Sequence, residues 1–261
     1  MSTGGAGCLY DLVRALITND DGIDSAGLRM LAQVAVAAGL KVTVAAPDGE
    51  RSGSSAAMSG LAAGGRLLVA DRALDGLEDV PTVAVQASPA MIVFVGTHGA
   101  FGPPPDIVLA GINRGPNIGR AILHSGTVGA ALTAASAGLP ALAVSLASDR
   151  AEHWGTAAAA TTRALGWFLP RAEVPVVVNV NVPDRPADQL RGLRAARLAS
   201  YRAARAIIGE PGEGFIPITF SELDAQPGAD TDLALIREGW ATVTVLEGLS
   251  ESSALDLSTL G

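Results

Sequence analysis

Two adjacent carboxylates follow the first apolar run of the sequence. Asp20 and Asp21 stand in the segment Asn19-Asp20-Asp21-Gly22, directly after the strand-like run 14–18. Paired carboxylates at the end of a strand suit a hard divalent cation such as Mg²⁺ or Mn²⁺, because these ions take oxygen ligands and keep positions open for water and phosphate. Asp-Gly is also a strong turn dipeptide, so the same four residues could form a plain turn.

Two further polar, glycine-rich segments each come after a strand-like run. They are residues 47–55 and 111–119. The carboxyl ends of parallel strands meet at one edge of a sheet, so we expect both segments to lie beside the aspartate pair. Ser52 offers a hydroxyl ligand and Asn113 a carbonyl ligand to the same cation. Each also has an ordinary alternative as a loop or turn residue.

A third signal is the segment Ser125-Gly126-Thr127, which precedes a helix predicted at 128–138. The free N–H groups at the start of a helix bind phosphate, and the two hydroxyls add donors. Ordinary N-capping by Ser125 or Thr127 is an equal alternative. His124 lies beside this segment, where it could donate a proton to a leaving group or a hydrogen bond to a phosphoryl oxygen.

Composition narrows the class of protein. The chain has 261 residues, of which 49% are hydrophobic and 17% charged, a balance that supports a folded core. A net charge of -8 argues against sequence-independent binding to nucleic-acid phosphates. The single cysteine, Cys8, excludes a disulfide scaffold and a cysteine-based zinc site. The sequence holds no G-x-S-x-G elbow, no P-loop and no H-E-x-x-H motif.

The elements that must position these residues alternate along the chain. Strands are predicted at 14–18, 41–46, 83–86, 106–110, 141–146, 174–182, 215–220 and 240–246. Helices are predicted at 25–39, 89–99, 128–138, 156–169 and 233–238. Continuous apolar strands separated by helices indicate a doubly wound, mostly parallel α/β sheet of the Rossmann-like type, followed by a C-terminal β-hairpin and helix extension.

The same pattern predicts three parts of the chain. Residues 1–13 are expected to form a loose N-terminal extension, 14–183 a Rossmann-like catalytic core, and 184–261 an extension that packs on the core or across a subunit interface. We find no secretory signal before the first strand. The uncharged stretch 121–148 fits a buried helix and strand better than a membrane span. We therefore expect a cytoplasmic protein.

The motifs together resemble one known family. The runs ITNDDGIDSAGLRML, VAAPDGERSGSSAAMS, PDIVLAGINRGPNIG, ILHSGTVGAAL and GLPALAVSL follow one another in order. They closely resemble the SurE family, the stationary-phase survival proteins, which are divalent-metal-dependent 5'- and 3'-nucleotidases. The resemblance covers about residues 14–182 and resumes at 230–246. It implies a Rossmann-like core, and a C-terminal extension exchanged between the subunits of a homodimer or homotetramer.

The resemblance also implies roles for individual residues. It assigns one Mg²⁺ or Mn²⁺ per subunit to Asp20, Asp21, Ser52 and Asn113. It assigns the phosphate pocket to Asn19, Ser125, Gly126 and Thr127. Arg51 and Asn117, which lie inside the motif segments, are further candidates for substrate binding. His124 matches a position often occupied by His or Tyr. One stretch departs from the family, because residues 87–92 read Ala-Ser-Pro-Ala-Met-Ile where Gly-Thr-Pro-x-Asp-Cys is usual.

From these residues and the resemblance we expect a phosphomonoesterase that hydrolyses nucleoside monophosphates. The cation would draw charge from a phosphoryl oxygen, and the start of the 128–138 helix would hold the other oxygens. The nucleophile is either a water molecule, with Asp20 as its base, or an aspartate carboxylate. The alternatives are a phosphatase for another small phosphate ester, motivated by the 87–92 stretch, and a phosphate-binding homologue without turnover. A nucleic-acid polymer or a membrane is not an expected partner.

Overall fold

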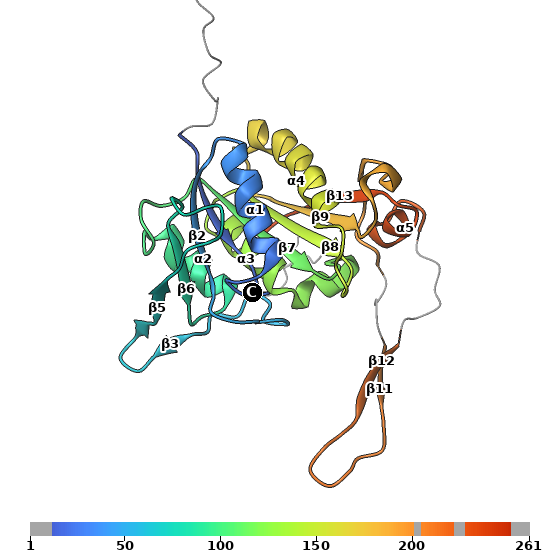
Figure 1. Cartoon of the computed structure of the whole chain (residues 1–261). Coiled ribbons are helices and arrows are strands. Elements are labelled where there is room, and N and C mark those ends of the chain that lie inside the picture. Colours follow the sequence, from blue (N-terminus) through green and yellow to red (C-terminus); the bar gives the residue numbers. More distant parts are fainter. Residues whose placement is uncertain (1–11, 201–204, 222–227, 252–261) are drawn as a thin grey trace, which may run out of the picture.

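A nine-stranded sheet forms the centre of the chain in this computed structural model, which describes residues 12–200, 205–221 and 228–251 (Figure 1). Its strand order is β10-β13-β9-β8-β7-β1-β2-β6-β5. Its strands are β1 Arg14–Thr18, β2 Lys41–Pro47, β5 Val69–Asp71, β6 Thr82–Val85, β7 Ile107–Arg114, β8 Ala141–Ala147, β9 Val177–Pro183, β10 Leu193–Ala195 and β13 Ala241–Leu246. Most of the expected N-terminal extension, with Cys8, lies outside the described residues.

Six neighbouring strands of the sheet, from β9 through β8, β7, β1 and β2 to β6, run parallel. β5 and β13 pair antiparallel with the outer members of this group. β1, β7, β8 and β9 are buried along nearly their whole length, because their apolar runs are continuous and both faces of the sheet are covered. The predicted mostly parallel α/β sheet is confirmed.

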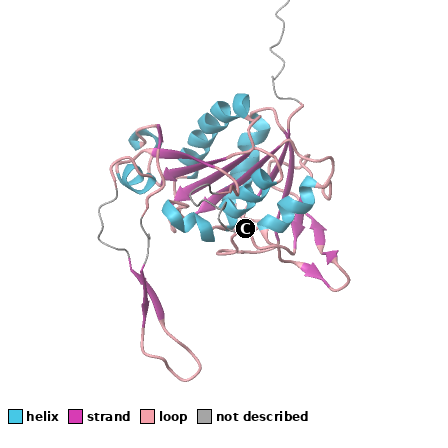
Figure 2. Ribbon diagram, turned by 180° about the vertical axis from the view of Figure 1, so that it is seen from behind, coloured by secondary structure: helices cyan, strands magenta, loops and turns pink. Residues whose placement is uncertain are grey.

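Four helices cover the two faces of the sheet (Figures 1 and 2). On one face lie α1 (Ala26–Ala37) and α4 (Trp154–Phe168), which share one apolar core. On the other lie α2 (Pro89–Thr97) and α3 (Gly126–Ser136), which share a second core. α3 consists largely of Gly, Ala and Thr, so its backbone lies close to β7 and β8.

One strand is longer than its sequence predicts, and this matters for the site. β7 continues past Ala110 to Arg114, because its register against β8 shifts between Ala110 and Asn113 and pairing then resumes. The shift falls at Gly111, whose φ is 127° and where a Cβ would lie 2.3 Å from the carbonyl oxygen of Val144. Asn113 is therefore placed by a strand and not by a free loop.

The C-terminal part extends one edge of the sheet and adds a hairpin. β13 and β10 lie beyond β9, whose first residue is Val177 and not the predicted 174, and α5 (Asp232–Arg237) packs on β13 and β9. β11 (Arg205–Ile208) and β12 (Ile218–Ser221) form an antiparallel hairpin that projects from the body (Figures 1 and 2). β10 and β11 were not predicted, because three or four residues are too few to show the apolar pattern of a strand.

The remaining elements are short. They are β3 Leu61–Ala62, β4 Arg66–Leu67, and the 3₁₀ helices η1 Gly119–His124, η2 Leu169–Arg171 and η3 Ala187–Gln189. Among the described residues, no helix has the length and apolar character needed to cross a bilayer.

An ion pair at the amino end of the sheet gives the fold a pH-dependent contribution. Arg14 of β1 donates from Nε and Nη2 to the Asp106 carboxylate, at 3.0 and 2.7 Å, and its backbone N–H donates at 2.8 Å. These bonds hold the pKa of Asp106 below its ordinary value. Because the pKa is lowered by folding, the stabilisation is complete above the unfolded pKa of about 4 and is lost as the pH falls through the folded pKa.

We therefore expect Asp106→Asn to lower the free energy of unfolding at pH 7 by about 1 kcal/mol, a value reduced for solvent screening because both side chains are 42% exposed. The difference from the unsubstituted protein should shrink as the pH falls below about 4. Urea unfolding at several pH values measures it. Asp75→Asn is the control, because Asp75 is 96% exposed and lies 3.6 Å from Arg29. A destabilisation that does not change with pH would contradict this account.

Candidate functional site

The site lies where the chain order of the sheet reverses. β1 stands between β7 and β2, so the crevice beyond the carboxyl ends of these strands is the expected place for a ligand. Three hydrogen bonds join the segments that line this crevice. The backbone N–H of Arg51 donates to the Asp20 carbonyl oxygen at 2.7 Å, that of Arg114 donates to Asp21 Oδ2 at 2.9 Å, and the Thr127 hydroxyl donates to Asp20 Oδ1. The segments after β1, β2 and β7 and the start of α3 therefore meet at one edge.

Asp20 is buried against the first turn of α3. Its side chain is 5% exposed, and burial raises its pKa, an effect that the hydrogen bond from Thr127 partly offsets. Gly126 makes this approach possible. A Cβ at that position would lie 2.5 Å from Ser54 Oγ and 2.7 Å from Asp20 Oδ2, which no real side chain tolerates. The first turn of α3 is thus seated directly on the carboxylate.

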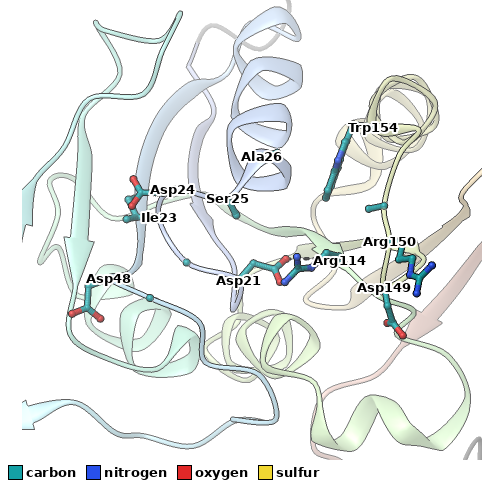
Figure 3. A pocket seen from close by; sticks show the side chains of 13 residues that line it. Asp21, Ile23, Asp24, Ser25, Ala26, Asp48, Arg114, Asp149, Arg150 and Trp154 are labelled. Carbon is teal, nitrogen blue, oxygen red and sulfur yellow. Dashed lines mark hydrogen bonds between the residues drawn. The ribbon is translucent and has the colours of Figure 1, made fainter.

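Asp21 is half-buried and faces the other way, toward α1 and α4 (Figure 3). Burial raises its pKa, the N–H of Arg114 lowers it, and the neighbouring charge of Asp20 raises it further. Within the described residues, neither aspartate has an ion-pair partner within 4.0 Å. The charge of the Arg114 guanidinium offsets Asp21 only in part, because burial still leaves the pKa of both carboxyls raised. Two desolvated carboxylates side by side are the electrostatic condition that a bound metal ion relieves.

The other two candidate ligands differ in how they are held. The Nδ2 of Asn113 donates to the Gly115 carbonyl oxygen at 2.8 Å. The Oδ1 of Asn113 takes no part in this hydrogen bond and can accept a cation. Ser52 is exposed and its hydroxyl donates to Glu50 at 2.8 Å, which leaves the lone pairs of its oxygen free to accept. The described residues hold no group of three or more His, Cys, Asp or Glu side chains placed for a metal. A cation here would rely on two carboxylates and neutral oxygen donors, a set that fits Mg²⁺ or Mn²⁺ and not zinc.

The first turn of α3 is capped as the sequence allowed. Ser125 is its N-cap, and the Ser125 hydroxyl accepts the backbone N–H of Val128 at 3.1 Å. Thr127 does not cap the helix, because its hydroxyl donates to Asp20. His124 is exposed at the end of η1, next to this turn. The helix start therefore contacts the buried carboxylate, and His124 stands one residue before the N-cap of this helix.

Ser54 is a site residue that the sequence did not single out. Its hydroxyl oxygen is buried and has no hydrogen-bond partner, and it lies against Gly126 and Asp20. An unsatisfied buried hydroxyl is costly, so the Ser54 hydroxyl is available to hydrogen-bond a ligand oxygen at this position. The only signal in the sequence is its place in the Gly/Ser run after β2. The adjoining Ser55 fastens this run to η1, since its hydroxyl donates to the Leu123 carbonyl oxygen at 2.6 Å.

Three further predicted residues make their contacts within the protein. Asn19 is buried and bonds the backbone of Gly22 and the Ser25 hydroxyl, which shapes the β1–α1 turn. Arg51 pairs with Asp48 at 3.0 Å on the surface. Asn117 lies in a buried amide network with Ser145, Asn179 and Asn181. Contact of these three side chains with a substrate stays a prediction.

A cavity of about 590 Å³ opens beside Asp21, between the start of α1 and the segment that joins β8 to α4 (Figure 3). Arg114, Asp149, Arg150 and Trp154 contribute to its walls. The last three were not predicted, because the segment after β8 lacks the glycine-rich pattern that marks the segments after β2 and β7. The rule that ligands bind beyond the strand ends applies to β8 as well, and it is the signal that could have found them.

The fold defines a Rossmann-like α/β protein, with a candidate ligand site where the chain order of its sheet reverses. A family model, Survival protein SurE, matches residues 15–205, and the chain belongs to this family. The 5'/3'-nucleotidase SurE of Serratia proteamaculans is 38% identical over 250 residues, 90% of each chain, and that of Yersinia pseudotuberculosis serotype O:1b is 35% identical over 251 residues, again 90% of each. The crystal structure of the SurE protein from Aquifex aeolicus matches with a TM-score of 0.75 and 28% identity over 95% of each chain. The resemblance in the motifs is confirmed.

Proposed function

We propose that the chain is a divalent-metal-dependent phosphomonoesterase that hydrolyses nucleoside monophosphates, as the names of its curated relatives suggest. The observation that carries the proposal is the pair of adjacent desolvated carboxylates, Asp20 and Asp21, of which Asp20 lies against the start of α3. A bound cation on one side and helical N–H groups on the other would form a binding site for a phosphoryl group.

Asp20, Asp21 and Asn113 would hold the cation, and Ser52 would join them by turning its hydroxyl from Glu50. When bound, the cation supplies positive charge that offsets the charge of the phosphoryl oxygens. The Ser54 hydroxyl would hold a further oxygen, together with the N–H groups of Gly126 and Thr127, which in this structure face the Asp20 carboxylate. This local supply of positive charge makes a net charge of -8 compatible with an anionic substrate.

The reaction is the transfer of a phosphoryl group to water. The water oxygen bonds to phosphorus while the ester P–O bond breaks, and Asp20, oriented by Thr127, takes the proton of the water. His124, exposed at the end of η1 next to the N-cap of α3, would return a proton to the departing alcohol oxygen. Attack by an aspartate carboxylate remains the alternative route, and trapping a phosphoryl-enzyme would favour it.

Phosphate release from a substrate panel tests the proposed function. The panel holds nucleoside 5'- and 3'-monophosphates and sugar phosphates, each with Mg²⁺, Mn²⁺ or EDTA. We expect nucleoside monophosphates to be the best substrates and EDTA to stop the release. Preference for a sugar phosphate would favour the alternative of another small ester, and release of phosphate from nothing on the panel would favour a binding protein without turnover.

The altered stretch 87–92 motivates the alternative of another small phosphate ester. In the structure this stretch acts on the site indirectly, through its contacts with the segment that follows β2. Ser88 caps α2, and its hydroxyl donates to the Ala57 carbonyl oxygen. Gly60 packs so closely on Ala87 that a Cβ there would lie 2.3 Å from Ala87 Cα. The stretch thus supports the far end of the segment that carries Ser52 and Ser54, and it does not line the cavity beside Asp21.

Cation binding predicts a change in stability that does not depend on turnover. A ligand at 100 times its Kd stabilises the folded state by about 2.7 kcal/mol, or roughly 5–10 °C for a chain of this size. We expect Mg²⁺ or Mn²⁺ to raise Tm accordingly, measured by differential scanning fluorimetry without substrate. Asp21→Asn should remove the shift, whereas Asp75→Asn, on the surface, should keep it. Equal shifts in all three proteins would point to a cation site elsewhere.

The β11–β12 hairpin supports a homodimer or homotetramer. Ile207, Ile208, Phe215, Ile216 and Ile218 are 49–63% exposed on it. An isolated two-stranded hairpin is at best marginally stable in water, so these side chains need a partner surface. We expect light scattering to give the mass of a dimer or tetramer. The double substitution Ile207→Asp with Phe215→Asp should reduce the number of subunits per particle. A monomer before any substitution would contradict this.

A further inference from the structure

We propose that the cavity beside Asp21 receives the nucleoside part of the substrate and that the indole of Trp154 is the surface on which the base stacks. The inference rests on the proposed function and adds a specificity-determining residue to it. The cavity holds about 590 Å³, within the range of small-molecule sites. A phosphoryl group alone needs far less room than this, so the cavity points to a substrate with a large leaving group.

The position of the cavity fixes which end of the substrate enters it. Asp21 forms part of its wall, whereas Asp20 and the first turn of α3 lie outside it. A phosphoryl group held by the aspartate pair and α3 therefore has its ester bond directed toward α1 and α4. Figure 3 shows Trp154 and Arg150 on the side of the cavity across from Ser25 and Ala26.

Trp154 is held in place by the close approach of α4 to α1. It is the first residue of α4, it is half-buried, and its ring edge packs on Gly27 of α1. A Cβ at position 27 would lie 2.9 Å from Trp154 Cζ3 and 1.9 Å from the Ile112 carbonyl oxygen, so only glycine fits there. Trp154 is the one aromatic residue among those that line the cavity. A fixed aromatic face next to an open volume suits base stacking, which tolerates any base.

The charge of the cavity favours a neutral group over a second phosphate. Four carboxylates and two guanidinium groups line it, namely Asp21, Asp24, Asp48, Asp149, Arg114 and Arg150. A phosphate placed among them would meet more negative than positive charge. A nucleoside is uncharged, and its amino and hydroxyl groups can donate to the carboxylates. The lining therefore separates the two halves of a nucleoside monophosphate between the cavity and the start of α3.

The test compares Trp154→Ala and Trp154→Phe with Trp167→Ala, a control in the same helix whose indole is 46% exposed away from the site. The first readout is the quenching of tryptophan fluorescence by adenosine in EDTA, which needs neither cation nor turnover. We expect quenching in the unsubstituted protein and in Trp167→Ala, and none in either Trp154 variant. Quenching that persists in Trp154→Phe would overturn the proposal, and Tm confirms that each variant is folded.

The second readout is the ratio of kcat/KM for AMP to that for glycerol 2-phosphate. We expect Trp154→Ala to lower this ratio about 10-fold or more and Trp154→Phe to restore most of it, because phenylalanine keeps a stacking face. An unchanged ratio would overturn the proposal. The two failures are distinguishable: no hydrolysis of any ester by the unsubstituted protein refutes the proposed function, whereas hydrolysis without adenosine quenching refutes only the role of the cavity.

Discussion

Asp20→Asn is expected to abolish phosphate release and, at the same time, to make the metal-free protein more stable. Asp20 is 5% exposed, burial raises its pKa, and no ion pair offsets its charge within the described residues. Asparagine keeps an oxygen that accepts the Thr127 hydroxyl but removes the buried charge. We expect a gain of roughly 1 kcal/mol, or about 2–4 °C in Tm, measured in EDTA.

The loss of activity should be much larger than the change in stability. The substitution removes a cation ligand and the group that takes the proton of water, so kcat should fall by about 10³-fold or more. Asp75→Asn is the matched control, because it changes the formal charge equally at a surface position and should move neither quantity. Substantial turnover by Asp20→Asn with saturating Mg²⁺ would refute the assignment. A loss of stability in EDTA would instead show that Asp20 is held charged by a partner in the fold.

Gly126→Ala is expected to damage the site through packing alone. The new Cβ would lie 2.5 Å from Ser54 Oγ, 2.7 Å from Asp20 Oδ2 and 2.8 Å from Asp20 Cβ. The first turn of α3 must then move away from the carboxylate, which breaks the contact from Thr127 and shifts the N–H groups that face the substrate. We expect kcat/KM to fall about 100-fold and the free energy of unfolding to fall by about 1–3 kcal/mol.

Gly166→Ala is the matched control for this change. Gly166 also lies in a helix, but a Cβ there would meet nothing within 4 Å. Alanine is the better helix former, so this variant should gain up to about 1 kcal/mol and keep its activity. Steady-state kinetics and urea unfolding of the two variants give the comparison. If Gly126→Ala kept full activity, the close seating of α3 on Asp20 would not be required for the chemistry.

The Asp20 result and the Gly126 result separate two properties of one site. The first concerns the charge that is buried there, and the second concerns the fit of the helix that surrounds it. A protein that only bound phosphate would need the fit, but it would have no use for an uncompensated pair of carboxylates. Opposite changes in stability for the two variants, with loss of activity in both, are the pattern expected of an enzyme.

Local patterns in the sequence were sufficient for the parallel core and for the position of the aspartate pair. The bounds of β1 are those predicted, and α1 begins at Ala26, one residue after the predicted helix start at Ser25, which caps it. This succeeded because a buried parallel strand needs a continuous apolar run and a helix start needs a capping side chain, and both are properties of neighbouring residues. The rule that ligands bind beyond the strand ends then placed the acidic pair at the correct edge.

Contacts between distant residues decided the rest. Thr127 and Asp20 are 107 positions apart, and nothing in either segment indicates that the hydroxyl serves the carboxylate and not the helix cap. The extension of β7 to Asn113 depends on pairing with β8, and the wall formed by Trp154 depends on the approach of α4 to Gly27. Sequence alone determines which residues are able to do chemistry and at which edge they gather. Only tertiary packing decides which of them face one another, because each such contact joins separate elements whose spacing is set by the whole core.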